Sequence, residues 1–224
     1  MTTTADLIDA LVECATPVRR LRPPVVRAVL WLALADLVLA LVAIVHGLRG
    51  DLTVRLHQPS FAIATAAALA TGILSAMAAF VISLPDRSRW WLMLPLPALA
   101  VWMSTIGYGC LIDWINMPEG LRLGDELRCL VILVLTSVPL AIAFAAMLRH
   151  AAMLRAVAVA TTGGLAIAAI TATALSLVHD HDATALTLLW NLGTALLITG
   201  LGSLFGRGMF HWMAARLTTS RPRV

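Results

Sequence analysis

Six long stretches almost free of charge dominate this sequence. They cover residues 28–45, 60–84, 90–112, 129–148, 156–178 and 183–206, and Asp36 in the first stretch is the only charged residue among them. A helix needs about 20 apolar residues to cross the hydrocarbon core of a bilayer. The stretches are continuously apolar rather than alternating, which excludes a membrane β-barrel. The sequence therefore predicts an all-α, polytopic membrane protein with six transmembrane helices.

The composition agrees with this fold class. The chain has 224 residues, of which 60% are hydrophobic and 12% are charged. Soluble domains carry about 25% charged residues, so a water-soluble enzyme, a disordered protein and a nucleic-acid-binding domain are excluded as the main body. The net charge of +4 is too small to indicate direct nucleic-acid binding.

Three regions follow from this pattern. Residues 1–27 are predicted to be a cytosolic helix and a basic, proline-stiffened tether, residues 28–206 the six-helix transmembrane domain, and residues 207–224 a basic cytosolic tail. All 16 basic residues are arginine. With the N-terminus inside, twelve of them fall on the cytoplasmic side and four on the outer side. This asymmetry favours both termini in the cytoplasm.

The N-terminal segment is predicted to form a short amphipathic helix over residues 3–15. Leu7, Ile8 and Leu11 share one face of this helix, and its three acidic residues lie away from that face. An apolar stripe with no domain beneath it docks on the protein's own helix ends, on lipid headgroups or in the groove of a cytosolic partner. The acidic residues argue against anionic headgroups; the other two alternatives remain open.

Two cysteines are expected at the outer face. Cys110 lies near the end of the third stretch and Cys129 begins the fourth. A disulfide persists in an oxidising compartment, but spacing alone cannot place two Cα atoms within bridging distance. The alternative is two unpaired cysteines that pack as small apolar side chains.

The last outer hairpin, His179-Asp180-His181-Asp182, contains side chains that can bind a metal. A short wet hairpin commonly contains the same residue types. No cysteine or third histidine lies near His179 and His181 in the sequence, so we expect no metal and no cofactor.

Asp36 is the one ionisable residue within the predicted spans. An acid at that depth is costly and is a functional candidate by default. It either serves a proton or cation path or forms a hydrogen bond to Ser, Thr or Asn191 on another span. A single acid without a partner cation in any span favours the structural role. The sequence also contains no conventional catalytic set, so we expect no enzyme.

Several segments resemble the NrsF family of bacterial six-span anti-sigma factors. The resemblance rests on residues 7–11 (LIDAL) and 17–24 (PVRRLRPP), on residues 127–130 and 136–140, and on residues 189–195 and 202–207. It implies a protein of the bacterial inner membrane that binds a sigma factor of the extracytoplasmic-function class. Periplasmic oxidative or metal stress would release that sigma factor.

Carried over to this chain, the resemblance assigns sigma-factor binding to Leu7, Ile8, Leu11, Val18, Arg19, Arg20 and Leu21. It also assigns redox sensing to Cys129. Some members have a second cysteine in the last outer hairpin, where this chain has the residues from His179 to Asp182. Either Cys110 takes that role or the sensing chemistry differs.

Two other function classes remain as alternatives. A membrane thiol oxidoreductase would pass electrons from Cys110 and Cys129 to a quinone, but the chain has no C-x-x-C motif. A small transporter would use Asp36, but a single acid and no visible inverted repeat argue against it. The expected partners are therefore the sigma factor and the lipid bilayer.

Overall fold

The computed structural model describes residues 22–84, 86–116, 123–148 and 155–178, with isolated positions 4, 9, 12 and 13 near the N-terminus. The elements are α2 (Pro24–His46), α3 (Leu52–Leu56), α4 (Pro59–Ile82), the 3-10 helix η1 (Arg89–Met93), α5 (Leu96–Asn116), α6 (Leu123–Leu148) and α7 (Ala156–Val178). Within these residues there are helices and no strand, which confirms the all-α class.

Five helical segments in the described part are long and apolar enough to cross a membrane. They are Pro24–His46, Pro59–Ile82, Arg89–Gly107, Val131–Leu148 and Val157–Val178. These segments correspond to the first five predicted spans. The sixth predicted span, residues 183–206, and the predicted tail, residues 207–224, lie outside the described residues.

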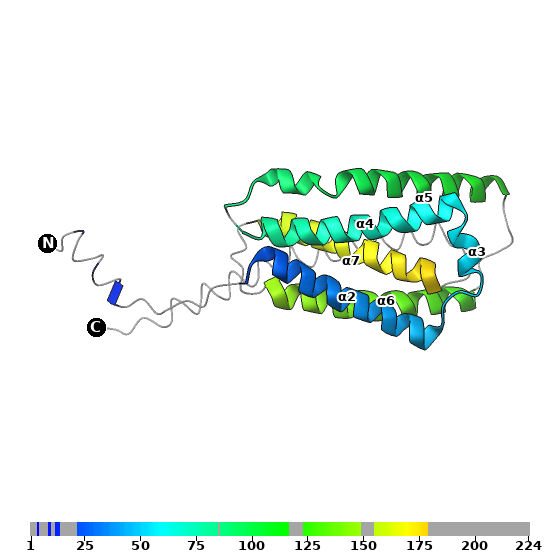
Figure 1. Ribbon diagram of the computed structural model, residues 1–224, viewed down its shortest axis with the longest axis horizontal. Helices are drawn as coiled ribbons and strands as arrows, with labels where there is room; N and C mark the ends of the chain where they lie inside the picture. The colour runs from blue at the N-terminus through cyan, green and yellow to red at the C-terminus, as the bar shows by residue number, and fades with distance from the viewer. Residues whose placement is uncertain are drawn as a thin grey trace.

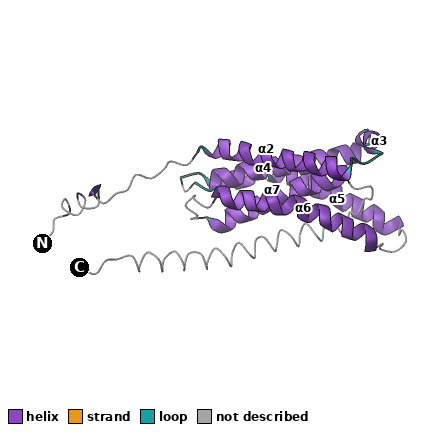
Figure 2. Ribbon diagram, turned by 90° about the horizontal axis from the view of Figure 1, so that it is seen from below, coloured by secondary structure: helices purple, strands orange, loops and turns teal. Residues whose placement is uncertain are grey.

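Helices α4 and α7 form the centre of the bundle (Figure 1). Helix α2 contacts α4, α6 and α7, whereas α5 contacts α4 and η1. Helices α5 and α6 consequently lie on opposite sides of the central pair (Figure 1). Figure 2, turned by 90°, shows the long helices running along a common axis with α3 at one end.

Each end of the bundle contains one buried arginine, and we name the two ends the Arg27 end and the Arg49 end. At the Arg27 end, α2 and α7 begin and α4 and α6 finish. At the Arg49 end, α2 and α7 finish, α4 and α6 begin, and α3 lies in the connection between α2 and α4. Both arginines are only 5% exposed.

Proline and glycine fix the ends of the first long helices. Pro24 and Pro59 occupy the first positions of α2 and α4, where a helix does not need the N–H that proline lacks. Gly47, which follows α2, has a φ of +81°, a conformation that glycine adopts at low cost. Helix α2 therefore begins before residue 28 and includes Arg27.

The third predicted span is not one continuous helix. The 3-10 helix η1 comes first, and the Ser88 side chain accepts a hydrogen bond from a backbone N–H in its first turn. Helix α5 then begins after a short break. Pro95 and Pro97 lack an N–H and disfavour the α conformation in the residues before them, which explains the break.

The other differences from the sequence concern helix ends near charged residues. Helix α6 begins at Leu123 rather than at residue 129, so it contains Asp125, Glu126 and Arg128. The apolar stretch predicts the segment within the bilayer, whereas the helical hydrogen bonds continue beyond it. The short helix α3 has no hydropathy signal and was not predicted.

Small side chains allow α4 and α7 to approach each other closely. A Cβ atom at Gly72 of α4 would lie 2.8 Å from the side chain of Ile170 on α7, so any larger residue there would force Ile170 to shift. The buried Thr71 hydroxyl donates to the Ala67 carbonyl at 2.7 Å, which satisfies its polar group within the helix. Small residues therefore bring the backbones of α4 and α7 close together, and larger side chains such as Phe80 and Ile167 complete the core around them.

An aromatic cluster joins α2, α4 and α6. Trp31 is fully buried, and its Nε1 atom donates to the Leu140 carbonyl at 3.1 Å. Its ring meets Phe144 edge-on with the centroids 5.9 Å apart, and Phe144 lies 5.2 Å from Phe80. Aromatic pairs at such distances stabilise a core beyond their buried area.

The contact between Phe144 and Gly163 yields a testable prediction. A Cβ atom at Gly163 would lie 2.2 Å from the Phe144 ring, so Gly163→Ala should separate α6 from α7 and lower stability by about 1–3 kcal/mol. Thermal unfolding in detergent measures the change. Gly107→Ala is the control, because a Cβ atom there would meet nothing within 4 Å. Equal melting temperatures for both variants would contradict this packing.

Candidate functional site

Many of the residues predicted to carry function lie outside the described part of the chain. They are Leu7, Ile8, Leu11, Val18, Arg19, Arg20 and Leu21 for sigma-factor binding, His179 and His181 as low-ranked metal candidates, and Asn191 as an intramembrane polar residue. The described N-terminal positions, Thr4, Asp9, Val12 and Glu13, are helical. The other positions of the predicted helix over residues 3–15 lie outside the described residues.

The two predicted sensor cysteines lie on different helices. Cys110 is on α5 and Cys129 is on α6. Helix α5 packs on α4, whereas α6 packs on α7 and α2 (Figure 1). Within the described residues, α4 and α7 therefore lie between the two cysteine-bearing helices (Figure 1).

The packing of α6 against α7 fixes the height of Cys129 in the bundle. Phe144 lies against Gly163, and Ile132 shares a core cluster with Leu175, which gives one antiparallel register for both contacts. Cys129 precedes Ile132 by three residues on α6, and Val178 follows Leu175 by three residues on α7. Because the two helices are antiparallel, Cys129 and Val178 lie at the same height. Cys129 is therefore level with the last residue of α7, at the Arg49 end.

The connection between α2 and α4 is held to this same end. The backbone N–H of Arg49 donates to the Leu177 carbonyl at 3.2 Å, so the loop after α2 is bonded to the last turn of α7. The Arg49 guanidinium also lies 5.9 Å from the centroid of the Phe61 ring. The Arg49 side chain is only 1% exposed, so this loop has a fixed anchor.

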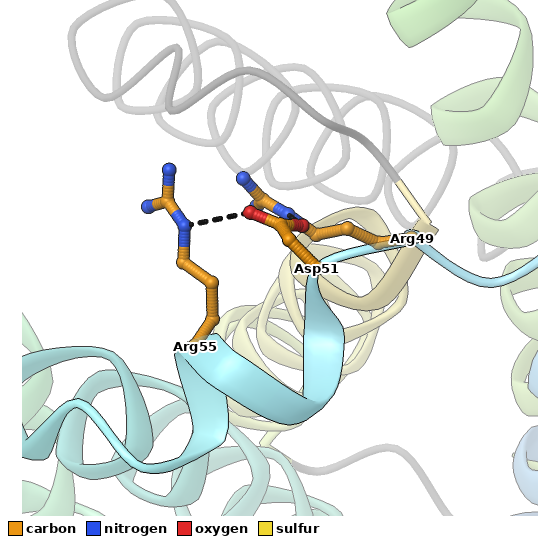
Figure 3. Close-up of polar contacts among 3 residues, drawn as sticks. All are labelled: Arg49, Asp51 and Arg55. Carbon is orange, nitrogen blue, oxygen red and sulfur yellow. Dashed lines mark hydrogen bonds and ion pairs between the residues drawn. The ribbon is translucent and has the colours of Figure 1, made fainter.

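Asp51 lies between two arginines in this loop (Figure 3). Its Oδ1 atom accepts from Arg49 Nε at 2.5 Å, and its Oδ2 atom accepts from Arg55 Nε at 3.1 Å. The hydrogen bond from Arg49 is the main cause that lowers the pKa of the Asp51 carboxyl below its usual value of 3.8. The carboxylate links the buried anchor to α3.

This pKa shift makes the order of the loop depend on pH. Because the folded pKa is lowered, the stabilisation is complete above 3.8 and is lost as the pH falls through the lower folded value. Asp51→Asn should therefore speed hydrogen exchange of residues 47–58 at neutral pH and abolish its acid dependence. Asp86→Asn, at the opposite end, is the control. Equal exchange in the wild type and Asp51→Asn would contradict a structural role for the carboxylate.

At the opposite end, Arg27 holds three helices together. Its Nη2 atom donates to the Met147 carbonyl in the last turn of α6, and its guanidinium carbon lies 5.3 Å from the centroid of the Phe80 ring on α4. Arg155 Nη1 also donates to the Arg87 carbonyl at 2.7 Å, which joins the start of α7 to the connection after α4. Arginine side chains therefore organise both ends of the bundle.

No metal centre occurs among the described side chains. No group of three His, Cys, Asp or Glu residues in that part of the chain could hold a metal ion. His57 has its Nδ1 atom 2.7 Å from the Thr53 carbonyl oxygen, which occupies one ring nitrogen within its own loop.

Asp36 lies on the outward face of α2 and its side chain is exposed. Large apolar residues of the same helix, Val29, Leu37, Leu41 and Ile44, are exposed as well. None of the described side chains pairs with Asp36. This position is unfavourable for a proton or cation path through the described bundle, because such a path would pass between the helices.

Sequence reasoning missed Arg27, Arg49 and Asp51. The spacing of Asp51 and Arg55 is a signal for an ion pair on a helix, and it was available in the sequence. The burial of Arg27 has no local signal, since its partners are a carbonyl and a ring on other helices. The side chain of Arg49 pairs with Asp51 two residues further on, but its contact with Phe61 depends on how the loop folds onto α4.

Comparison with known proteins identifies the family. The family model described as NrsF, negative regulator of sigma F, matches residues 11–212. No curated protein and no solved structure matches the chain significantly. The match includes the last five residues of the predicted N-terminal helix, the basic tether and every helix from α2 to α7. The chain therefore belongs to the NrsF family and is a negative regulator of a sigma factor.

Proposed function

We propose that this protein is a membrane-bound anti-sigma factor for a sigma factor of the extracytoplasmic-function class. It holds the sigma factor at the cytoplasmic face of a bacterial inner membrane and releases it when a periplasmic stress modifies Cys129. The observation that carries the proposal is the family match over residues 11–212. The five helices apolar enough to cross a membrane support the membrane location.

The arginine distribution supports the orientation. The connection after α4 contains Arg87 and Arg89 and belongs to the arginine-rich side, together with the N-terminal tether. The Arg27 end is then cytoplasmic and the Arg49 end is periplasmic. Reporter fusions within residues 119–126 and after Val224 should report opposite sides of the membrane. The same side for both would contradict the six-span topology.

The N-terminal helix is the proposed sigma-binding element. Leu7, Ile8 and Leu11 form its apolar face, and a groove on the sigma factor would accept this face. The tether that follows ends at Pro23, where α2 begins. Because prolines stiffen the tether, the sigma factor would remain close to the Arg27 end.

Cys129 is the proposed sensor residue. Its backbone position lies level with Val178 at the Arg49 end, and His179 follows Val178 in the sequence. A thiol near cationic groups has more thiolate character and reacts faster with oxidants and soft metal ions. Among the described residues the main neighbours of α5 are α4 and η1, whereas α6 packs on α7 and α2; this arrangement favours Cys129 acting with the segment after α7 rather than with Cys110.

Capture of the partner tests the proposal. The full chain, solubilised in mild detergent from its own bacterium, should retain one sigma factor that mass spectrometry identifies. Oxidant treatment of the cells before extraction should reduce the retained amount. Absence of any sigma factor from the untreated extract would refute the proposed function.

A further inference from the structure

Arg27 is placed between the proposed tether and the transmembrane bundle. It lies in the first turn of α2, directly after the tether. Arginine side chains at the end of a membrane helix usually extend towards water, whereas Arg27 is only 5% exposed. Its side chain is directed into the bundle, where it contacts other residues of the protein rather than water.

The partners of Arg27 are neutral groups on two other helices. The Met147 carbonyl lies in the last turn of α6, where carbonyls lack helical partners and the helix dipole is negative. The Phe80 ring of α4 lies beneath the guanidinium, and rings attract cations through their faces. No carboxylate within the described residues pairs with Arg27. We call these two contacts the Arg27 clasp.

Helix α6 follows α2 from one end of the bundle to the other. At the Arg49 end, Val42 of α2 and Ile132 of α6 share a core cluster. In the middle, the Trp31 indole donates to the Leu140 carbonyl. At the Arg27 end, the clasp completes the contact. A single helix thus extends from Cys129, one turn beyond Ile132, to the partner of Arg27.

We infer that Arg27 is a positioning residue that couples the outer thiol to the N-terminal tether. Modification of Cys129 displaces α6 relative to α2, and the clasp transmits this displacement to the first turn of α2 and to the tether. This regulation rests on the proposed function. Arg27 itself contacts neither the sigma factor nor the stress signal.

The test uses the full-length protein with its bound sigma factor in lipid nanodiscs. In a Cys14→Ala, Cys110→Ala background, a charged maleimide modifies Cys129, and the dissociation rate of the sigma factor is measured before and after labelling. With Arg27 present, labelling should accelerate dissociation about tenfold or more. With Arg27→Met, the unlabelled complex should dissociate at the wild-type rate, and labelling should change this rate less than twofold.

Arg22→Met is the matched control, because Arg22 is exposed and lies in the tether. It should respond to labelling as the wild type does. Full acceleration in Arg27→Met, or loss of acceleration in both variants, would overturn the role of Arg27. Fast dissociation of the unlabelled Arg27→Met complex would also overturn it, because the clasp would then serve binding rather than coupling.

Two further outcomes distinguish a failure of this inference from a failure of the proposed function. If labelling does not accelerate dissociation in the presence of Arg27, the sensing role of Cys129 fails and this inference fails with it. If Arg27→Met does not accumulate, Arg27→Lys replaces it, because lysine keeps the charge but cannot place a planar group over Phe80. Reduced acceleration then supports the clasp, and wild-type acceleration overturns it.

Discussion

Leu7→Asp combined with Leu11→Asp should release the sigma factor permanently. Each buried leucine stabilises an interface by about 1.5–3 kcal/mol, and about 1.4 kcal/mol corresponds to a tenfold change in affinity. The double variant should therefore bind the sigma factor about two to four orders of magnitude more weakly. In cells the target genes should be expressed without stress. Reporter expression and capture from detergent extract measure the two effects.

The matched control adds the same charge elsewhere on the helix. Ala5→Asp with Ala10→Asp leaves the predicted face of Leu7, Ile8 and Leu11 intact, so repression should persist. Both variants should insert into the membrane in normal amounts. A leucine variant that inserts normally and still represses would exclude this helix as the binding element. The connections around Arg87 and Arg155 would then be the next surfaces to test.

Cys129→Ser should abolish the response to periplasmic oxidant and leave repression intact. The reason is its position on α6, level with the last residue of α7. Cys110→Ser should retain most of the response, because the described part of α5 packs on α4 and η1 rather than on the bundle face that carries α6. Reporter induction after peroxide treatment measures both variants.

Thiol labelling provides the accompanying chemical test. A membrane-impermeant maleimide should label Cys110 and Cys129 in reduced cells, because both cysteines lie towards the predicted outer side, and it should leave Cys14 unlabelled. Full induction in Cys129→Ser would show that the stress is not sensed by this thiol. Equal loss of induction in Cys110→Ser would indicate that the two cysteines act together after a rearrangement of α5.

The long helices could be predicted from the sequence because hydropathy reports directly on burial in a bilayer. The five described spans coincide with the first five apolar stretches, and the main differences occur where charge or proline intervenes. Pro95 and Pro97 separate η1 from α5, and α6 extends through Asp125 and Glu126. Hydropathy averages over a window and therefore does not report where helical hydrogen bonds begin.

The contacts between the helices could not be predicted in the same way. Membrane helices associate through shape and local hydrogen bonds, and these depend on which helices are neighbours. Nothing near Arg27 in the sequence indicates the carbonyl of Met147 or the ring of Phe80. Likewise, the separation of α5 from α6 follows from the three-dimensional arrangement, although the two helices are consecutive in the chain.

The close pairing of α4 with α7 also imposes an order on biosynthesis. Ribosomes add about 5–20 residues per second, so roughly 5 to 20 seconds pass between the emergence of Ile82 and that of Val178. During that time α4 has entered the membrane with Gly72 still without its neighbour on α7, Ile170. Helices α2 and α5 are the partners already available to it. The centre of the bundle is therefore assembled late, and a chain truncated after α6 should be recognised by membrane quality-control proteases.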